Sequence, residues 1–575
     1  MKKNFKSLVA LVLAIMVFAS MSVAFAANGA SATHTITITN DDQVGAHTYE
    51  AYQVFAGDYD ASSKKLSNIT WGAGVDGTAI LNAVKADTTT FGADAANAAT
   101  PEDVAKLLGG AGTDTEKAKK FAAIVGANLS TTVAGTSEAT ASPYAISVTG
   151  DGYYFVKDKA GTLPTDTDNQ YPQKADAETR YILQVVNDVT VAAKSNTVQS
   201  SKKIDDTNDS TGTAEATQDS ADYDIGDKIP YTLTATLPSN YADFEAYYLQ
   251  FVDDMSEGLT YNNDAKIYYG TSDTTGANIT FTEDTSATSD YTNGTVYTAT
   301  IKNLKTEKAG LTAGTVITIK YSATLNDKAV IGETGNPNKS HIVFNNNPNN
   351  SGEGKPTSTT PDDKVIAFTY ELEVDKVTGT PAEKLTGANF ALYKLFKDEE
   401  EMTKVNEGRA AGSKYTKATE IKYDNKTKEY AIGTDIWALV SEITATDKSE
   451  FTFSGIDDGT YLLVETKTPD GYNSIQPMKF TVEADHDKTS DDPKLNSITG
   501  SDAKGSATTL DAISLSELMK ESKKTGLKTD VVNNGGATLP STGGIGTTIF
   551  YVAGSILVLA AAILLITKRR MGAND

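Results

Sequence analysis

Hydrophobic and polar residues alternate along most of this chain. Clear examples are THTITITN (33–40), KIPYTLTATLP (228–238) and TVITIKYSATL (315–325). A period of two is typical of β-strands that bury one face. A helical period is confined to 100–110, where Pro101 gives a start signal, and to 115–129. Because clusters of Gly, Asn, Asp and Thr separate the alternating segments, the pattern predicts an all-β chain.

The strand candidates fall into three units, at 30–192, 195–362 and 366–536. Tracts at 205–222 and 349–363 lack the alternation, so we expect a loop and a linker there. The first and third units echo each other: HTYEAYQVF (47–55) matches ANFALYKLF (388–396), and DGYYFVKD (151–158) matches DGTYLLVE (458–465). We therefore expect two related β-sandwich domains that flank a different one.

Both ends of the chain carry export and membrane signals. Residues 1–27 read as a signal peptide, because lysines precede an apolar run and AFA (24–26) fits the rule for cleavage after small residues. Residues 545–566 carry no charge and are long enough to form a transmembrane helix. The tail 567–575 contains Lys-Arg-Arg and should stay in the cytoplasm. The pattern predicts that everything between these ends lies outside the cell.

The composition narrows the class of protein further. The formal net charge is −24 over 575 residues, which disfavours binding to nucleic acid or to anionic lipid. The chain has no cysteine, so a secreted protein of this size cannot use disulfides. Its domains must be stabilised by their cores, by metal or by another covalent bond.

The stretch LPSTGG (539–544), with the apolar segment and KRR after it, resembles the LPXTG sorting signal of Gram-positive surface proteins. The resemblance implies that a sortase cleaves between Thr542 and Gly543, holds Thr542 as a thioester and passes it to an amine. The motif residues are Leu539, Pro540, Ser541, Thr542 and Gly543. The helix and the basic stop would hold the chain at the membrane only until this transfer.

The segment NDVTVAAKSNTV (187–198) resembles the pilin motif, whose lysine is the acceptor amine in sortase-built pili. Lys194 is the matching residue. The valines of this strand share one face, and Lys194 falls on the opposite face. Solvent, and therefore a sortase, should reach it there. The family motif has Tyr-Pro before the lysine, whereas this chain has Ala-Ala, and an ordinary surface lysine is the alternative.

Strand parity places three polar residues of the third unit in its core. Lys376 shares a face with Leu372 and Val374, and Glu465 and Asn533 occupy core-facing positions on other strands. Burying a lone ammonium is very costly, so Lys376 requires a partner. A buried salt bridge beside an unrelated asparagine is the alternative to a reactive set.

This set resembles the isopeptide-forming site of CnaB-like pilin domains, on the motifs ELEVDKV and YLLVETKTPDGY. The resemblance implies a bond from Lys376 to the side chain of Asn533, with ammonia lost and Glu465 assisting. Desolvation lowers a lysine pKa and raises a glutamate pKa, which yields a neutral amine and a protonated acid. Folding supplies the proximity, so the reaction occurs once and is not enzymatic turnover.

The middle unit has an analogous set. FVDDMSEGLTY (251–261) and FNNNP (344–348) resemble the isopeptide-forming D2 domain of pilus shaft proteins, which is CnaA-like. The resemblance implies a bond from Lys202 to Asn346 with Asp253 as the helper. Parity favours Lys202 over Lys203 and selects Asn346 from three consecutive asparagines, and a β-bulge would shift either choice by one residue.

The first unit lacks a complete set. Asp158 falls where Glu465 falls in the third unit, but no lysine occurs between the signal peptide and Lys64. Its first strand therefore offers no nucleophile, and we expect no isopeptide bond in this unit.

Over nearly its whole length the chain resembles the Spa-type backbone pilins of Gram-positive bacteria. The resemblance implies tandem Ig-like (Cna-type) β-sandwich domains in a structural, non-enzymatic shaft subunit of a covalent surface pilus that supports adhesion. Its partners would be a class C pilin sortase, a housekeeping sortase, identical subunits, tip and base minor pilins, and peptidoglycan. No cofactor and no metal are expected.

Other classes explain less of the sequence. A monomeric wall-anchored adhesin of the MSCRAMM type would share the tail and the isopeptide bonds without needing an acceptor lysine. A surface hydrolase is disfavoured because the 575 residues contain only four histidines and no GxSxG or HExxH motif. The acidic run 205–209 offers ligands for calcium, but it lacks the EF-hand spacing, so a solvated loop is the prediction there.

Overall fold

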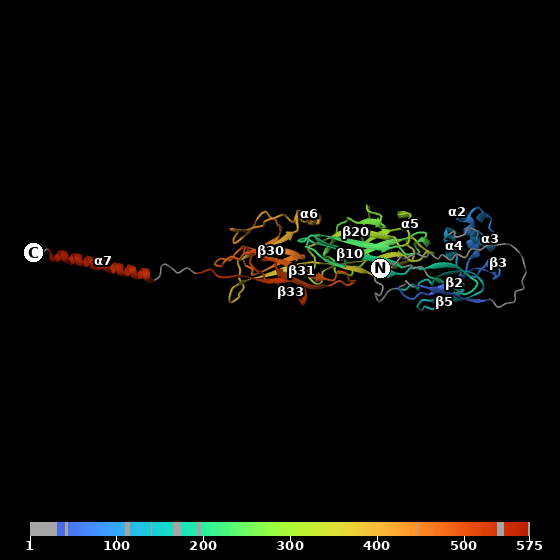
Figure 1. Ribbon diagram of the computed structural model, residues 1–575, viewed down its shortest axis with the longest axis horizontal. Coiled ribbons are helices and arrows are strands. Elements are labelled where there is room, and N and C mark those ends of the chain that lie inside the picture. Colours follow the sequence, from blue (N-terminus) through green and yellow to red (C-terminus); the bar gives the residue numbers. More distant parts are fainter. Residues whose placement is uncertain are drawn as a thin grey trace.

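The computed structural model describes residues 32–40, 44–109, 115–139, 141–164, 174–192, 197–445, 447–537 and 545–572. Three β-sandwich domains follow one another along the long axis, and a single helix extends from the C-terminal end of the row (Figure 1). This confirms the predicted all-β class. The signal peptide, Lys194 and the sorting motif lie outside the described residues.

The first domain packs two sheets and a helical layer. One sheet has the order β5 (Tyr144–Thr149), β1 (Thr33–Thr39), β9 (Val189–Ala192). The other has the order β3 (Lys65–Trp71), β2 (Tyr49–Asp60), β6 (Gly152–Asp158), β8 (Arg180–Val185), with β4 (Gly135–Thr136) also paired to β2. The helices are α1 (Gly77–Ala86), α2 (Thr88–Phe91), η1 (Ala93–Asn97), α3 (Pro101–Gly109) and α4 (Thr115–Ala127).

Of these helices the sequence pattern predicted α3 and α4 and missed α1, α2 and η1. Asp76 caps α1 and Asp87 caps α2, and each carboxylate accepts a hydrogen bond from the backbone N–H three residues further along the chain. Ile80 and Val84, four residues apart, are buried in the core between the helices and the sheet that contains β2, β3 and β6. Two buried positions are too few to give a helical period in a sequence of this composition.

The middle domain is a sandwich of an eight-stranded and a seven-stranded sheet. The first contains β11 (Thr213–Gln218), β10 (Val198–Asn208), β13 (Lys228–Thr236), β20 (Val316–Leu325), β16 (Lys266–Tyr269) and β17 (Ala277–Asn278), with β15 (Leu259–Tyr261) and β7 (Lys174–Ala175) off this path. The second contains β12 (Ser220–Asp222), β23 (Asp363–Phe368), β21 (Asn336–Asn345), β14 (Leu249–Met255), β19 (Thr295–Ile301) and β18 (Thr282–Glu283), with β22 (Thr357–Thr359) paired to β21. Two short helices, η2 (Tyr241–Asp243) and α5 (Leu304–Glu307), lie in its connections.

Two tracts that the sequence predicted to be irregular contain strands in the structure. The tract 205–222 forms the end of β10, a turn, β11 and β12, so the expected acidic loop is wrong. The tract 349–363 contributes β22 and the start of β23, which pair with β21 of the middle domain. The middle domain therefore runs to Phe368, and the single buried residue Thr369 separates it from the next strand. The polar composition gave the wrong prediction for these strands because they lie at sheet edges and at the domain junction, where strands need not alternate between apolar and polar residues.

The third domain is again a two-sheet sandwich. One sheet has the order β29 (Glu450–Ile456), β24 (Tyr370–Thr378), β34 (Lys523–Asn533), β33 (Ser516–Lys520). The other has the order β28 (Ile436–Thr444), β25 (Asn389–Phe396), β30 (Gly459–Lys467), β31 (Met478–His486), β32 (Leu495–Asp502). A hairpin of β26 (Ile421–Tyr423) and β27 (Lys428–Tyr430) and helix α6 (Glu399–Gly408) decorate it.

The first and third domains share a pairing scheme as well as a sequence echo. In each, the first strand runs parallel to the last: β1 pairs with β9, and β24 pairs with β34. Tyr49 stands opposite Asp158 on β2 and β6, and Phe390 stands opposite Glu465 on β25 and β30. The structure thus gives Asp158 the position in its sheet that Glu465 has in the third domain.

The C-terminal helix α7 (Ile545–Met571) is long and apolar. Its segment Thr548–Met571 spans 24 residues, the most apolar 18 of them have a mean hydropathy of 2.7, and none of those is buried against the rest of the chain. Lys568, Arg569 and Arg570 lie in its last turns. Length and composition are those of a membrane-spanning helix.

Candidate functional site

The core of the third domain contains Lys376, Glu465 and Asn533. Lys376 on β24 faces inward with Leu372 and Val374, as strand parity predicted. Asn533 lies two residues beyond Val531, the residue opposite Lys376 in the parallel pair, so both side chains lie on the same face. Glu465 comes from the facing sheet, and all three side chains are at most 1% exposed.

Glu465 lies between the amine and the amide. Its Oε1 is 3.7 Å from Lys376 Nζ, and its Oε2 accepts from Asn533 Nδ2 at 3.0 Å. Thr468 Oγ1 also donates to Oε2, at 2.8 Å, and fixes the carboxyl. Lys376 Nζ donates to the carbonyl of Val531 at 2.8 Å.

Burial adjusts these groups for reaction. Desolvation lowers the pKa of Lys376 to about 8 and raises the pKa of Glu465. A proton can therefore pass from the ammonium to the carboxylate at modest cost, leaving a neutral nucleophile beside a protonated acid. The Oδ1 atom of Asn533 is buried with no hydrogen-bond partner among the described residues, so it is open to the acid when charge develops on that oxygen.

The middle domain holds an equivalent set around Lys202 and Asp253. Both side chains are 0% exposed, and Lys202 Nζ lies 2.5 Å from Asp253 Oδ2. Tyr321 Oη accepts from Lys202 Nζ at 2.8 Å and donates to Asp253 Oδ2 at 2.9 Å. Burial lowers the pKa of Lys202 and raises the pKa of Asp253. Lys203 points the other way and pairs with Asp219 at the surface, so the structure agrees with the parity choice.

The amide beside this pair is Asn338, whereas the sequence pointed to Asn346. Asn338 is 0% exposed on β21, and its Nδ2 donates to Tyr321 Oη at 2.8 Å. Asn346 follows the end of β21, and its Nδ2 donates to Ser358 Oγ at 2.9 Å. The two asparagines share strand parity, so alternation alone could not separate them. The cross-strand register, which sets Asn338 opposite Met255 next to Asp253, decides it.

The first domain fills the corresponding position with a histidine. Asp158 Oδ1 lies 2.6 Å from His47 Nδ1, and Asp176 Oδ2 lies 3.0 Å from His47 Nε2. Burial alone lowers the pKa of His47, but the two carboxylates outweigh it and raise that pKa to about 9. Asp158 also accepts from the backbone and hydroxyl of Thr179. The buried carboxylate of Asp158 is thus paired with the imidazolium of His47.

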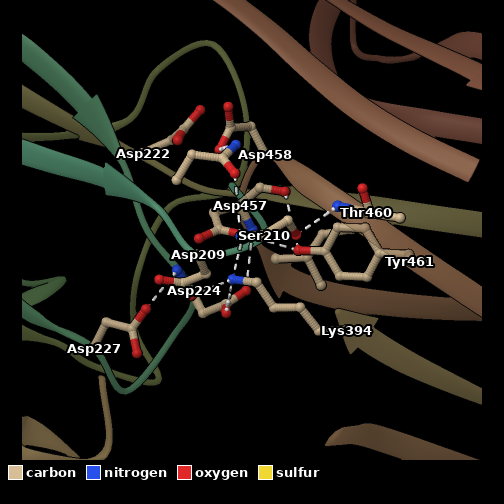
Figure 2. A network of polar contacts seen from close by, with 12 residues as sticks. Asp209, Ser210, Asp222, Asp224, Asp227, Lys394, Asp457, Asp458, Thr460 and Tyr461 are labelled. Carbon is tan, nitrogen blue, oxygen red and sulfur yellow. Dashed lines mark hydrogen bonds and ion pairs between the residues drawn. The ribbon is translucent and has the colours of Figure 1, made fainter. Parts of the chain in front are cut away.

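A third buried lysine, which the sequence analysis missed, lies between the middle and third domains. Lys394 on β25 is 0% exposed, and its Nζ contacts three carboxylates, as Figure 2 shows. The partners are Asp209 at 2.6 Å, Asp224 at 2.7 Å and Asp457 at 2.6 Å. The signal was present in the sequence, because Lys394 has the parity of Phe390 and Phe396 in ANFALYKLF, the segment that echoes the first domain.

This cluster differs chemically from the two lysine–asparagine sets. Burial lowers the pKa of Lys394, but its three carboxylates outweigh burial and raise the pKa well above its ordinary value. The amine is therefore held as an ammonium and is a poor nucleophile. Arg409 pairs with Asp227 alongside, and Tyr415 and Tyr461 donate to the carboxylates of Asp224 and Asp457. The arrangement acts as an ionic clasp between two domains.

Three segments of the chain match known families. Residues 225–348 match the family described as Gram-positive pilin backbone subunit 2, Cna-B-like domain. Residues 370–494 match the SpaA family, described as a prealbumin-like fold domain, and residues 531–571 match the LPXTG cell wall anchor motif. The first description gives the middle domain a Cna-B-like fold, where the resemblance in the sequence implied a CnaA-like one.

Individual relatives are of the same kind. The trypsin-resistant surface T6 protein of Streptococcus pyogenes serotype M6 is 27% identical over 369 residues, which is 60% of this chain and 65% of that protein. The structure of the T6 backbone pilin of S. pyogenes is similar with a TM-score of 0.49 and 16% identity, over 88% of this chain and 99% of that one. The structure of the full-length major pilin SpaD of Corynebacterium diphtheriae is similar with a TM-score of 0.42 and 14% identity, over 88% of this chain and 98% of that one.

The family matches indicate the class of protein. One domain matches a Gram-positive pilin backbone family, the next matches a prealbumin-like domain family, and the C-terminal segment matches the LPXTG cell wall anchor motif. The cell-wall anchor predicted from the sequence is therefore confirmed, and the pilin backbone match falls on the unit that the sequence likened to a pilus shaft domain.

Proposed function

We propose that the chain is the shaft subunit of a covalent surface pilus, and that two of its domains are locked by intramolecular isopeptide bonds. The observation that carries this proposal is the pair of buried lysine–acid–asparagine sets in consecutive domains of an LPXTG-anchored chain. A subunit that transmits tension without disulfides gains most from such bonds, because a cross-link between strands prevents their separation. The pilin backbone family of the middle domain supports the same function.

The bond of the third domain would join Lys376 to Asn533. The amine, having given a proton to Glu465, attacks the side-chain carbonyl carbon of Asn533, while the protonated Glu465 donates to the developing oxyanion. Collapse of the tetrahedral intermediate expels the amide nitrogen as ammonia, with Glu465 relaying the protons. One carbon–nitrogen bond forms and one breaks. The low-dielectric core and the fixed geometry lower the barrier.

The bond of the middle domain would join Lys202 to Asn338 by the same steps, with Asp253 in the place of Glu465. Tyr321 holds the amine, the acid and the amide together through one hydroxyl. This replaces the pair Lys202–Asn346 with a pair that the geometry supports. Because Lys202 and Asn338 lie on facing sheets, the bond would clamp the sandwich shut.

Polymerisation would join Thr542 of one subunit to Lys194 of the next. A class C pilin sortase would form these links, and a housekeeping sortase would attach the finished polymer to peptidoglycan, with minor pilins at the tip and base. Two observations support this link: β9 ends at Ala192, two residues before Lys194 in the sequence, and β34 ends at Asn533, nine residues before Thr542 in the sequence, on different terminal domains of the row (Figure 1). Identical subunits joined in this way form an open head-to-tail polymer.

The alternative is a monomeric wall-anchored adhesin with the same domains. Wall extracts from cells that express the chain separate the two functions. A shaft subunit gives a ladder of multimers that resists boiling in SDS, and the ladder disappears in Lys194→Ala while Lys64→Ala, at a surface turn of the first domain, leaves it unchanged. A single monomeric band from the wild-type chain would support the adhesin.

A further inference from the structure

The junction between the middle and third domains contains a second polar cluster beside the Lys394 clasp. Asp206 on β10, Asp222 on β12 and His486 on β31 present one carboxylate or imidazole atom each within 4.8 Å of one another. Asp222 is 3% exposed and His486 is 6% exposed, while Asp206 is half-buried. The two aspartates come from the tract that the sequence led us to expect as a solvated loop.

Hydrogen bonds fix the tautomer of His486. Ser220 Oγ donates its proton to the carbonyl of Asp487 at 2.7 Å. The same hydroxyl lies 2.8 Å from His486 Nδ1, and since its proton is already used, it accepts there and Nδ1 must carry a hydrogen. The lone pair of a neutral imidazole is then on Nε2.

That lone pair points at a carboxylate. His486 Nε2 lies 4.0 Å from Asp222 Oδ2, which is too far for a hydrogen bond. Among the described residues no side chain or backbone group donates a hydrogen bond to Nε2, and a lone pair that faces a carboxylate oxygen is unfavourable unless a positive charge lies between them.

The aspartates are short of positive charge as well. Figure 2 shows Asp222 and Asp458 side by side above the clasp. The ammonium of Lys394 is held by its own three carboxylates, and Lys488, whose charge acts on the cluster, donates to Glu215.

We propose that Asp206, Asp222 and His486 bind a divalent transition-metal ion, with Zn²⁺ as the best fit. One imidazole and two carboxylates form a ligand set typical of zinc, with water in the remaining position, whereas calcium and magnesium prefer oxygen ligands alone. Two ligand atoms that each lie about 2.0–2.1 Å from a tetrahedral zinc ion are about 3.4 Å apart, so the 4.0 Å between His486 Nε2 and Asp222 Oδ2 would shorten by about 0.6 Å when the ion binds.

The surrounding groups have the roles of outer ligand partners. Ser220 orients the imidazole through Nδ1, and Tyr370 Oη donates to Asp222 Oδ2 at 2.8 Å and holds that carboxylate in place. Because Asp206 and Asp222 belong to the middle domain and His486 to the third, the ion ties the two domains together. It would do so whether or not the chain polymerises, so the site is independent of the proposed shaft function.

Native mass spectrometry of the intact chain, purified without a polyhistidine tag and incubated with ZnCl₂, tests this site. We expect one bound zinc ion per chain, lost in His486→Gln and in Asp206→Asn but kept in His341→Gln, whose histidine pairs with Asp362 at the surface of the middle domain. The melting temperature of the wild-type chain should rise with zinc, and that rise should be absent in His486→Gln. Failure of the wild-type chain to bind zinc, or zinc binding that persists in both His486→Gln and Asp206→Asn, would overturn the proposal.

Discussion

Lys202 and Asn338 lie on facing sheets of the middle domain and donate to the same hydroxyl. Lys202 Nζ and Asn338 Nδ2 are each 2.8 Å from Tyr321 Oη, which itself donates to Asp253. One phenol thus gathers the amine, the amide and the acid that an isopeptide bond requires. The relationship selects Asn338 over the asparagines at the end of the same strand.

Replacing Asn338 with alanine should therefore prevent the bond in the middle domain. The mature wild-type chain should be lighter than its sequence mass by two ammonia molecules, and Asn338→Ala by one after allowance for the substitution. Intact-protein mass spectrometry measures both. The matched control is Asn346→Ala, which should keep both losses, and a single loss in that variant would refute the assignment.

Glu465→Gln should block the bond of the third domain while leaving Lys376 and Asn533 in place. The neutral amide cannot take the proton from Lys376, so the mass should show one ammonia loss instead of two. The chain-entropy relation for a cross-link that closes a long loop predicts a loss of about 5 kcal/mol in the unfolding free energy of this domain. Guanidinium unfolding measures this loss.

The exposed residue Glu483 on the neighbouring strand provides the control for Glu465→Gln. Glu483→Gln should keep both ammonia losses and unfold as the wild-type chain does. Full bond formation in Glu465→Gln would show that the carboxyl has no part in the reaction.

His47 should make the stability of the first domain depend on pH. Its folded pKa of about 9 lies above the ordinary value of 6.5, so its contribution is complete below about pH 6.5 and is lost as the pH rises through 9. A shift of this size corresponds to roughly 3 kcal/mol. Hydrogen exchange of β2 and β6, corrected for intrinsic rates, should show weaker protection at pH 9.5 than at pH 6.

In His47→Gln the protection of β2 and β6 should be lower than in the wild-type chain at pH 6 and should lose this pH dependence. Strands β13 and β20 of the middle domain serve as an internal reference in the same sample. Equal protection of β2 and β6 at both pH values in the wild-type chain would contradict the buried imidazolium.

Lys394→Met should loosen the junction between the middle and third domains. Removing the ammonium leaves Asp209, Asp224 and Asp457 buried and uncompensated, which costs on the order of 3–5 kcal/mol. Limited proteolysis should then cut near Thr369, the residue between the two domains, at a rate that the wild-type chain does not show.

Adding Asp209→Asn and Asp457→Asn to Lys394→Met should restore part of the resistance, because fewer buried charges lack a partner. Lys404→Met, on the exposed face of α6, is the control, and the protease should cleave it no faster than the wild-type chain. The intact mass should be free of any water loss, since the clasp is ionic. A loss of water that disappears in Lys394→Met would instead indicate a covalent lysine–aspartate link.

Strand alternation predicted much of the fold and also the lysine–acid–asparagine set of the third domain. Each strand of a β-sandwich has one face toward the core and one toward solvent, so the parity of a residue decides whether its side chain enters the core. It placed Lys202, Lys376, Glu465 and Asn533 inside, and the structure agrees. It failed between Asn338 and Asn346, which have the same parity. That choice depends on which residue lies beside Asp253 across the sheet, and register of this kind is set by tertiary contacts.

The junction between the domains was the least predictable part. Asp206, Asp209 and Asp222 lie in a polar tract without alternation, and their burial comes from contact with the third domain, which lies far away in the sequence. Lys394 carried the same parity signal as Lys376, yet its partners come from other segments, so no local motif accompanies it. Ion clusters between domains are therefore hard to find from composition and period alone.

The central claim is that identical subunits are joined end to end, and peptide mapping of wall-extracted polymer tests it most directly. Digestion followed by tandem mass spectrometry should recover a branched peptide in which the carboxyl of Thr542 is bonded to Lys194 Nζ of the next subunit. Polymer in which Thr542 is linked to another lysine would contradict the acceptor. Chains in which Thr542 is bonded only to peptidoglycan would contradict the shaft function itself.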